Sequence, residues 1–433
     1  MMPNRKKQGL SRRAFCQQGI GWSAAVAFPL VLPTHVLGRE GQTAPSETLT
    51  MGAVGIGGRG RHVLNTFMKR PDVRVLGVCD VQQSRRLESK ACVDQKYGDT
   101  ACAMYNDMRE LFARQDIDFV MIATGNRWHT LASIWAARQG KDIYCEKPVS
   151  MTFQEARAVQ AAIHHYDVVF QAGTQRRNSD NFQFAVSLAQ SGKLGKLTEV
   201  HANILWPGTR PEWRPGEPQP PVEVCDWDRW LGPVQWRPYH SAYLRIAGWY
   251  RYDDFEGEMP GWASHTLDMC QWAAQKDTEV PVEWFPQFDE KGNQKWDIHA
   301  RYADGLKLIM RPADWLGLGT CGIRLVGEEG WVETADSRRV EVSHDRLRQG
   351  MRVFRVGISE VPHVAEFLDC VRTRRTCTSN IDVTVNSHIA CHCSSIAWKL
   401  GRHLTFDPTA EKFHDRAADG LLSRAMREPY TLT

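Results

Sequence analysis

The chain has 433 residues but, outside one short N-terminal stretch, no run apolar enough to suggest a membrane span. Its net charge is only +4, and no basic block occurs beyond the N-terminus, which gives a nucleic-acid-binding role little support. Internal repeats and low-complexity domains are absent as well. With 42% hydrophobic and 24% charged residues, the composition is that of an ordinary globular protein, long enough for two domains.

The cysteines do not form the pattern of a disulfide-stapled protein. The 12 cysteines are dispersed, and Cys16 falls in the N-terminal segment, which leaves an odd number. Cys391 and Cys393 stand beside His388 and His392 and resemble a small metal cluster. The surrounding residues predict a helix, however, on which the two thiols point to different faces. We therefore expect buried structural thiols and no metal ion.

The first 47 residues have the features of an export signal. Residues 4–7 and the arginine pair of the SRRAF motif at 11–15 form a basic segment, and an apolar stretch follows at 19–32. This stretch is short and interrupted by a serine and a proline, which fits a removable twin-arginine signal. We expect cleavage after Gly38, passage through the twin-arginine export machinery, and a periplasmic or otherwise exported protein. An uncleaved basic tail is the alternative.

Residues 48–174 alternate between short apolar strands and helical segments. Such alternation predicts a parallel sheet with helices on both faces. The strands are predicted at 49–54, 73–79, 118–123, 142–145 and 168–171, and two of the helices at 61–69 and 128–139.

The pattern changes after Thr174. Residues 206–238 are rich in proline and tryptophan and show little periodicity. Two later pairs of strand-like runs are joined by short turns, which indicates a mainly antiparallel sheet in a second domain at 175–433. These pairs are 296–302 with 306–310 and 322–327 with 330–333, and helices are predicted at 361–372 and 384–400. The expected fold class is therefore α/β, in two domains.

A glycine turn joins the first predicted strand to the first helix. In the sequence GIGGRG, Gly55 allows the tight bend, Gly57 lets the backbone approach a pyrophosphate, and Gly60 lets the helix pack on the sheet. Asp80 follows at the end of the next strand, where a carboxylate can bind both ribose hydroxyls and repel a 2′-phosphate. We expect a Rossmann domain that binds NAD in preference to NADP. Because two arginines stand nearby in the sequence, NADP is the alternative cofactor.

A second polar motif, Cys145-Glu146-Lys147-Pro148, ends another predicted strand of this sheet. Ligands collect at this edge in such folds. A lysine there can stabilise an alkoxide and tune a neighbouring base. By itself, the motif would equally fit an ordinary strand-to-helix turn.

Several motifs occur in one order along the chain and together resemble the Gfo/Idh/MocA (glucose–fructose oxidoreductase/inositol dehydrogenase) family. They are the glycine turn at 55–60, Asp80, Thr124 with His129, Glu146-Lys147-Pro148, the GTQ triplet at 173–175 and the GWASH motif at 261–265. The resemblance covers residues 48–433. It implies a Rossmann domain, an α/β domain with an open sheet, NAD as the cofactor, sugar or polyol substrates, and a homo-oligomer. Because an exported protein meets no obvious pool of free nicotinamide cofactor, we expect its NAD to be tightly bound.

By position, the resemblance implies two catalytic residues. Lys147 would contact nicotinamide and substrate, and His265 would take the proton of the substrate hydroxyl, a task that suits imidazole near neutral pH. Cofactor contacts are implied for Gly55, Gly57, Gly58, Arg59, Gly60, Asp80, Thr124, Asn126, His129, Glu146, Lys147 and Gln175. Substrate contacts are expected for Arg176, Trp206, Tyr252, Trp262 and His265.

Two positions depart from the family pattern. Family members carry an aspartate four residues before the histidine, where this chain has Gly261, and the usual Thr-Pro is changed to Thr-Gly at 124–125. The lysine–aspartate–histidine set is therefore incomplete, unless Glu256, Glu258 or Asp268 supplies the carboxylate.

Tryptophans gather in and beside the proline-rich segment. Because aromatic faces stack on sugar rings, we expect two or three of them at the site and the rest in structural roles. They are Trp206, Trp213, Trp227, Trp230, Trp236, Trp249 and Trp262.

Three functions remain open. The leading hypothesis is an NAD-dependent oxidoreductase that transfers a hydride at a carbinol carbon of a sugar, polyol or sugar derivative, with the bound cofactor recycled by a second substrate. The alternative is an NAD-dependent glycosidase that oxidises a ring hydroxyl transiently, eliminates the aglycone, adds water and returns the hydride. This redox-neutral cycle depends less on a complete lysine–aspartate–histidine set. The absence of the aspartate at Gly261 therefore favours the glycosidase. The third is a sugar-binding module without activity, against which Lys147 and His265 argue.

Overall fold

The computed structural model describes residues 47–204, 212–250, 252–256, 259–312, 315–349 and 359–432. The predicted export signal, Trp206 and Glu258 lie outside these residues. Among the helices of the described ranges, none has the length and apolar character that a membrane span requires.

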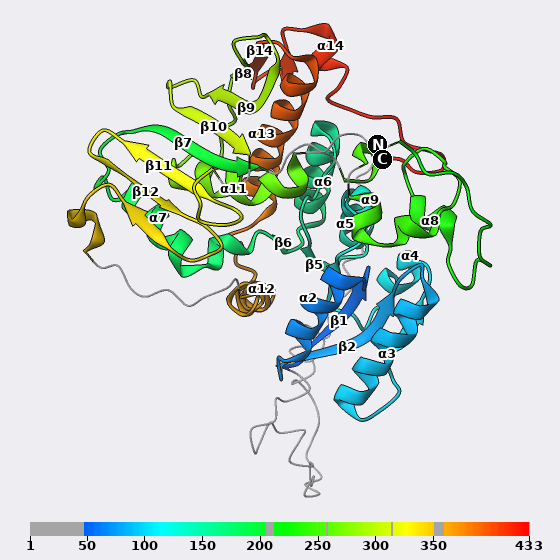
Figure 1. Cartoon of the computed structure of the whole chain (residues 1–433). Coiled ribbons are helices and arrows are strands. Elements are labelled where there is room, and N and C mark those ends of the chain that lie inside the picture. The colour runs from blue at the N-terminus through cyan, green and yellow to red at the C-terminus, as the bar shows by residue number, and fades with distance from the viewer. Residues whose placement is uncertain are drawn as a thin grey trace, which may run out of the picture. The chain divides into compact units, whose positions relative to one another are not determined.

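Six parallel strands form the sheet of the N-terminal domain (Figure 1). Their order is β3-β2-β1-β4-β5-β6, the doubly wound arrangement with its switch point between β1 and β4. The strands are β1 (Leu49–Val54), β2 (Val73–Cys79), β3 (Ala103–Tyr105), β4 (Phe119–Ile122), β5 (Asp142–Cys145) and β6 (Phe170–Ala172). The helices of this domain are α2 (Gly58–Met68), α3 (Gln83–Tyr97), α4 (Met108–Phe112), α5 (His129–Arg138) and α6 (Phe153–Tyr166).

The predicted parallel sheet is confirmed, and its central strands follow the sequence pattern closely. All residues of β4 and β5 are buried, as strands covered on both faces must be. The last strand begins later than the predicted residues 168–171. Helix α6 ends at Tyr166, Asp167 takes a left-handed conformation with φ 51°, and β6 starts only at Phe170. The short β3 was not predicted, because three partly exposed residues carry too little pattern.

The second sheet has nine strands in the order β13-β12-β11-β7-β10-β9-β8-β14-β15. It is mainly antiparallel, as predicted, and the pairs β9–β10 and β11–β12 are the two expected hairpins. One pair, β7–β10, is parallel. The strands are β7 (Leu197–Ile204), β8 (Glu283–Phe288), β9 (Gln294–Arg301), β10 (Lys307–Pro312), β11 (Ile323–Gly327), β12 (Gly330–Thr334), β13 (Val340–Val342), β14 (Leu404–Asp407) and β15 (Lys412–Phe413).

Two long helices, α11 (Pro260–Ala273) and α13 (Ile381–Leu400), pack against each other beside the second sheet. The Asn380 side chain caps α13 by accepting the N–H groups of Asp382 and Val383. Cys391 and Cys393 point to different faces of α13 and both are fully buried, because this helix is covered nearly all round. The other helices of this domain are α7 (Asp180–Gln190) and α14 (Arg416–Asp419). Helix α12 (Val361–Thr373) packs its apolar side into the core of the Rossmann domain, where Phe367 contacts Phe67 and Phe119.

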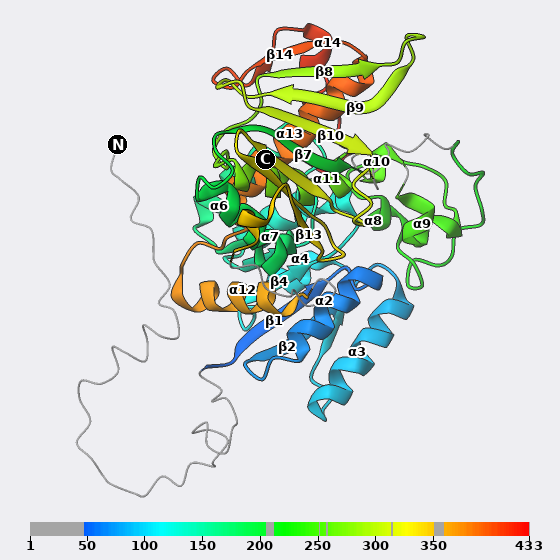
Figure 2. The same cartoon turned by 60° about the vertical axis from the view of Figure 1, so that its left-hand side comes forward.

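The segment from 212 to 256, here called the insertion, has a small aromatic core of its own. It carries the short helices α8 (Trp227–Leu231), α9 (Ile246–Trp249) and α10 (Asp253–Glu256). The core consists of Trp227, Trp230, Leu231, Val234, Tyr239, Tyr243, Tyr252 and Phe255. Backbone hydrogen bonds join the insertion to the Rossmann domain, from Gln83 to Val224 and from Asp226 to Val81. Figure 2 shows α8, α9 and α10 on the side of the molecule where α3 lies.

Candidate functional site

A cavity of about 940 Å³ opens where β1, β2, β4 and β5 end. It lies at the switch point of the sheet, the position at which ligands bind in such folds, and its volume is near the upper end of the roughly 300–1,000 Å³ found for ligand pockets. Most predicted site residues line it: Gly55, Gly57, Gly58, Arg59, Asp80, Thr124, Asn126, His129, Glu146, Lys147, Gln175, Arg176, Trp262 and His265.

The glycine turn has the geometry that a bound pyrophosphate requires. Gly55 has φ +77°, and a Cβ atom there would lie 2.4 Å from the backbone nitrogen of Thr124. A Cβ atom on Gly60 would lie 1.9 Å from the carbonyl oxygen of Gly55, so Gly60 packs helix against strand rather than lining the cavity. Helix α2 begins with no side-chain cap and no acidic residue in its first turn, which suits an anion at its N-terminus.

Asp80 is buried at the carboxyl end of β2 and anchors the glycine turn. Its carboxylate accepts the N–H of Ile56 at 3.0 Å and the N–H of Gln82 at 2.9 Å. Burial raises the pKa of Asp80, and the guanidinium of Arg85, 3.7 Å away, opposes this rise. Each carboxylate oxygen keeps acceptor capacity for a ribose hydroxyl. The turn, the uncapped helix and this carboxylate together fit NAD.

Lys147 follows β5 and reaches across to α11. Its ammonium group donates a hydrogen bond of 2.5 Å to the carbonyl oxygen of Gly261 and lies 5.6 Å from the ring centre of Trp262. Burial lowers the pKa of Lys147 to about 8, with Arg176 adding to the effect and Glu146 opposing it. A lysine with this pKa exchanges its proton readily near neutral pH.

His265 lies one helical turn after Gly261 and is buried. Arg176 donates a hydrogen bond of 2.9 Å to its Nε2 atom. An arginine can only donate, so Nε2 accepts and the ring proton is on Nδ1, which has no partner among the described residues. Burial and the charges of Arg176 and Lys147 hold the pKa of His265 well below its usual value. Arg176 is itself held by Asp336 through two hydrogen bonds of 2.6 and 3.1 Å.

A network of charges closes the cavity beside the glycine turn. Arg59 contacts Glu146 at 2.7 Å and Glu360 at 2.9 Å, and Gln175 donates to Glu146 at 3.2 Å. Although burial acts to raise it, the pKa of Glu146 is lowered by the adjacent Arg59. Glu360, which precedes α12, belongs to no motif, and sequence reasoning missed it.

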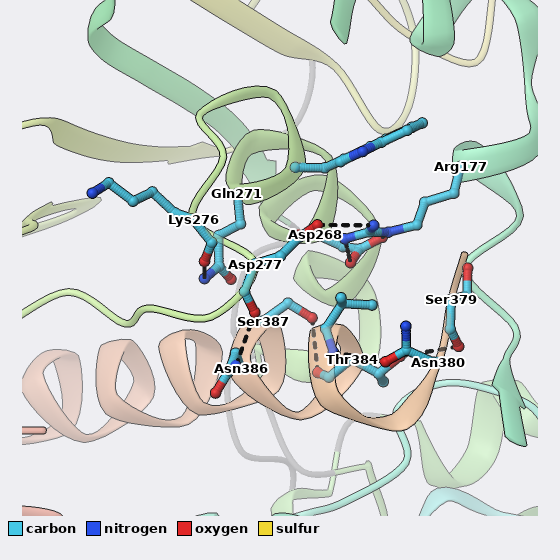
Figure 3. A network of polar contacts seen from close by, with 12 residues as sticks. Arg177, Asp268, Gln271, Lys276, Asp277, Ser379, Asn380, Thr384, Asn386 and Ser387 are labelled. Carbon is cyan, nitrogen blue, oxygen red and sulfur yellow. Dashed lines mark hydrogen bonds and ion pairs between the residues drawn. The ribbon is translucent and has the colours of Figure 1, made fainter. Parts of the chain in front are cut away.

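Asp268 does not supply the missing carboxylate. It is buried below the site and takes two hydrogen bonds of 2.8 Å from Arg177, which also pairs with Asp277 (Figure 3). Asp268 does not line the cavity. Glu256 is placed differently, because a Cβ atom on Gly261 would lie 2.3 Å from its Oε1 atom.

Tyr252 also lies away from the cavity, in contrast to its predicted substrate contact. Its ring stacks on Trp213 at 4.3 Å within the aromatic part of the insertion, and its hydroxyl donates to the carbonyl oxygen of Glu212. Of the tryptophans considered above, Trp230, Trp249 and Trp262 line the cavity, whereas Trp213, Trp227 and Trp236 do not.

Several cavity residues carry no sequence signal. They come from loops, from the insertion and from the C-terminal tail, and only the folded chain brings them to the site. They include Asn106, Arg109, Trp128, Trp135, Leu244, Ile246, Tyr250, Glu360 and Tyr430. For Trp249 and Tyr250 the sequence offers one weak hint of a place in the site, because they follow the tryptophan-rich segment.

Two family models match the chain. The model of an oxidoreductase family with an NAD-binding Rossmann fold matches residues 49–174, and that of the same family's C-terminal alpha/beta domain matches residues 193–432.

Curated relatives match over shorter stretches. Inositol 2-dehydrogenase of Salmonella typhimurium is 30% identical over 172 residues, 39% of this chain and 49% of that protein. A glycosyl hydrolase family 109 protein of Saccharopolyspora erythraea is 34% identical over 112 residues, 25% of this chain and 24% of that protein. The chain thus spans about half or less of the length of the curated relatives it matches.

Solved structures share the fold over most of the chain. Myo-inositol 2-dehydrogenase from Lactobacillus plantarum aligns with a TM-score of 0.58 at 16% identity, covering 83% of this chain and all of that one. This likeness concerns the fold alone. The two family models, by contrast, cover both domains in sequence, and the chain therefore belongs to the Gfo/Idh/MocA oxidoreductase family.

Proposed function

We propose that the protein is an NAD-dependent oxidoreductase that transfers a hydride at a carbinol carbon of a sugar, polyol or sugar derivative. One observation carries this proposal. A single continuous cavity has the glycine turn and Asp80 at one part of its wall and Lys147, His265 and Trp262 at another. When bound, NAD would accept the hydride from the substrate carbon.

The residues of the chain would handle the proton and the orientation. Removal of a hydride from a carbinol carbon also requires loss of the hydroxyl proton, and a neutral His265 or a neutral Lys147 can take it. The structural pairing of Arg176 with His265 implies that a substrate hydroxyl displaces this guanidinium from Nε2. Trp249 and Trp262 offer aromatic faces on which a sugar ring can stack.

We further propose that the cofactor stays bound between turnovers. The insertion crosses from the second domain to the adenosine side of the cavity, where Arg85 beside Asp80 donates to the carbonyl oxygen of Leu244 at 2.7 Å. Arg127 binds the carbonyl oxygen of Trp230, and residues 244–250 supply part of the cavity wall. These hydrogen bonds hold the segment as part of the cavity wall, which would slow the release of a nucleotide bound in the cavity.

The redox-neutral glycosidase is the second candidate. The likeness to a glycosyl hydrolase family 109 protein supports it. In such a cycle the ring hydroxyl would be oxidised transiently, the aglycone would be eliminated, water would add, and the hydride would return to the same molecule. Such a cycle needs no second substrate and no supply of free cofactor.

A pair of assays on purified protein, without added NAD, separates these proposals. Heat denaturation should release NAD, which chromatography identifies. The protein is then incubated with 4-nitrophenyl α- and β-glycosides and, separately, with D-glucose and myo-inositol. A change in the absorbance of the reduced nicotinamide with a free sugar or polyol supports the dehydrogenase. Release of 4-nitrophenol without net reduction supports the glycosidase, and no turnover together with no bound nucleotide would refute both.

We also propose that the SRRAF motif directs export of the folded, cofactor-loaded protein through the twin-arginine machinery. Changing both arginines of the motif to lysine should retain the protein in the cytosol. Cell fractionation with an immunoblot measures this, and unaltered export of the double variant would contradict the proposal.

A further inference from the structure

Glu256, the last residue of α10, places its side chain directly against the backbone of α11. A Cβ atom built on Gly261 would lie 2.3 Å from Glu256 Oε1 and 3.0 Å from its Cγ and Cδ atoms. The side chain of Glu256 therefore occupies the space that any side chain at position 261 would need. Glycine at this position is what allows the carboxylate to approach the helix so closely.

The same carboxylate holds a residue of the cavity wall. The Tyr250 hydroxyl is hydrogen-bonded to Glu256, and burial together with the nearby negative charge raises the pKa of Tyr250 well above its usual value. Tyr250 lines the cavity together with Lys147 and His265, as a neutral hydroxyl that can contact substrate. The backbone carbonyl of Glu256 accepts a hydrogen bond of 2.9 Å from Asn126, which ties α10 to the Rossmann domain.

Three titratable groups converge on one turn of α11. Lys147 approaches from the end of β5 and binds the carbonyl oxygen of Gly261, while Glu256 approaches from α10 and covers the Cα side of the same residue. His265 lies four residues further along α11 and so on the same helix face as position 261. The positive charges of Arg176 and Lys147 disfavour proton uptake by His265, and a carboxylate near position 261 would act against them.

We infer that Glu256 is a positioning residue of the proposed active site, a carboxylate delivered from α10 into the side-chain space of Gly261. It orients the Tyr250 hydroxyl toward the cavity and favours the protonated forms of Lys147 and His265 during proton transfer. The carboxylate that would stand at position 261 is then supplied by Glu256 from α10, so that glycine at this position does not imply a loss of function. This inference rests on the proposed hydride-transfer function.

Five variants of the cofactor-loaded protein, one of them a control, test it. Glu256→Gln removes the charge at nearly constant shape. Gly261→Ala adds a methyl group whose three nearest neighbours are atoms of the flexible Glu256 side chain, and so displaces the carboxylate without deleting it. The double variant Glu256→Ala with Gly261→Asp returns a carboxylate from α11, and Glu256→Ala alone is its reference. Asp253→Asn, on the same short helix and outside the cavity lining, is the matched control.

On the substrate found active with the unaltered protein, Glu256→Gln, Glu256→Ala and Gly261→Ala should each lower kcat about 100-fold, with smaller changes in KM. The double variant should recover most of what Glu256→Ala loses, and Asp253→Asn should stay unchanged. In Glu256→Gln the alkaline limb of the pH–rate profile should move to lower pH, because the ammonium of Lys147 loses a favourable charge. Unaltered kcat and pH profile in Glu256→Gln, or no recovery in a folded, NAD-loaded double variant, would overturn the inference.

A spectroscopic titration keeps the test independent of turnover. Tyrosinate absorbance of the loaded protein is followed with pH, using Tyr250→Phe as the blank for the other tyrosines. Tyr250 should ionise at lower pH in Glu256→Gln than in the unaltered protein, and an unchanged titration would contradict the pairing. An inactive unaltered protein that still shows this shift would refute the proposed function and leave the Tyr250–Glu256 pair standing.

Discussion

Lys147 of the Rossmann domain donates a hydrogen bond to the backbone carbonyl of Gly261 in the second domain. This contact joins the end of β5 to the first turn of α11, and hence brings Lys147 next to the helix that carries His265. The side chain lines the cavity and is partly buried, and its charge is therefore poorly solvated.

Replacement of Lys147 by methionine should raise stability while abolishing turnover. Burial lowers the pKa of Lys147 to about 8 in the folded protein, below its value of about 10.4 in an unfolded chain. Holding the ammonium in the fold therefore costs stability below pH 8, and this cost fades as the pH rises from about 8 to about 10.4. Lys147→Met should melt a few degrees higher at pH 7, with a difference that shrinks toward pH 10. A lower melting temperature at pH 7 would show that the bond to Gly261 outweighs the desolvation.

The two glycines at 58 and 60 should respond in opposite ways to alanine. A Cβ atom on Gly60 would lie 1.9 Å from the backbone oxygen of Gly55, whereas a Cβ atom on Gly58 meets nothing within 4 Å. Gly60→Ala must move backbone, so it should lower the melting temperature and the NAD content of purified protein. Gly58→Ala is the control for folding and should retain the melting temperature of the unaltered protein. An unchanged NAD content in a folded Gly60→Ala variant would argue against this turn as the pyrophosphate site.

Removal of Arg176 should raise the pKa of His265. The guanidinium both occupies Nε2 and places a positive charge beside the ring, and each effect disfavours the imidazolium. In Arg176→Met the histidine ring resonance should titrate at higher pH by NMR, and the acid limb of the pH–rate profile should move the same way. Asp336→Asn loosens Arg176 without removing its charge, so it should shift this pKa less. An equal shift in both variants would mean that orientation, not charge, sets the pKa.

Asp268 should prove structural. Its partner Arg177 is almost fully buried, and loss of the Asp268 charge leaves this guanidinium paired with the partly exposed Asp277. Asp268→Asn should lower the free energy of unfolding, toward the lower end of the about 3–5 kcal/mol found when a buried ion pair is broken. Chemical denaturation measures this loss, and turnover per folded molecule should persist at low temperature. Wild-type stability, or a folded variant without turnover, would contradict the assignment.

The sequence predicted most of the Rossmann domain, and many of the residues it assigned to the cofactor line the cavity, because their signals are local. Buried strands leave continuous apolar runs, and a turn such as Gly55 to Gly60 is set by the conformational freedom of neighbouring residues. The mainly antiparallel second sheet was also predicted, since its hairpins join strands adjacent in sequence. The parallel β7–β10 pair was not, because the insertion and two intervening strands separate β7 from β10 along the chain.

By itself the sequence determined the glycine turn, the carboxylate of Asp80, the position of Lys147 just after a strand and the position of His265 in a helix. Only the tertiary structure decided what surrounds them. It set Arg176 on the His265 lone pair, moved Tyr252 out of the cavity, buried Asp268 under Arg177 and laid Glu256 on Gly261. The physical reason is the separation of the interacting residues along the chain. Backbone conformation follows from neighbouring residues, whereas these contacts follow from how α10, α11 and the sheets pack together.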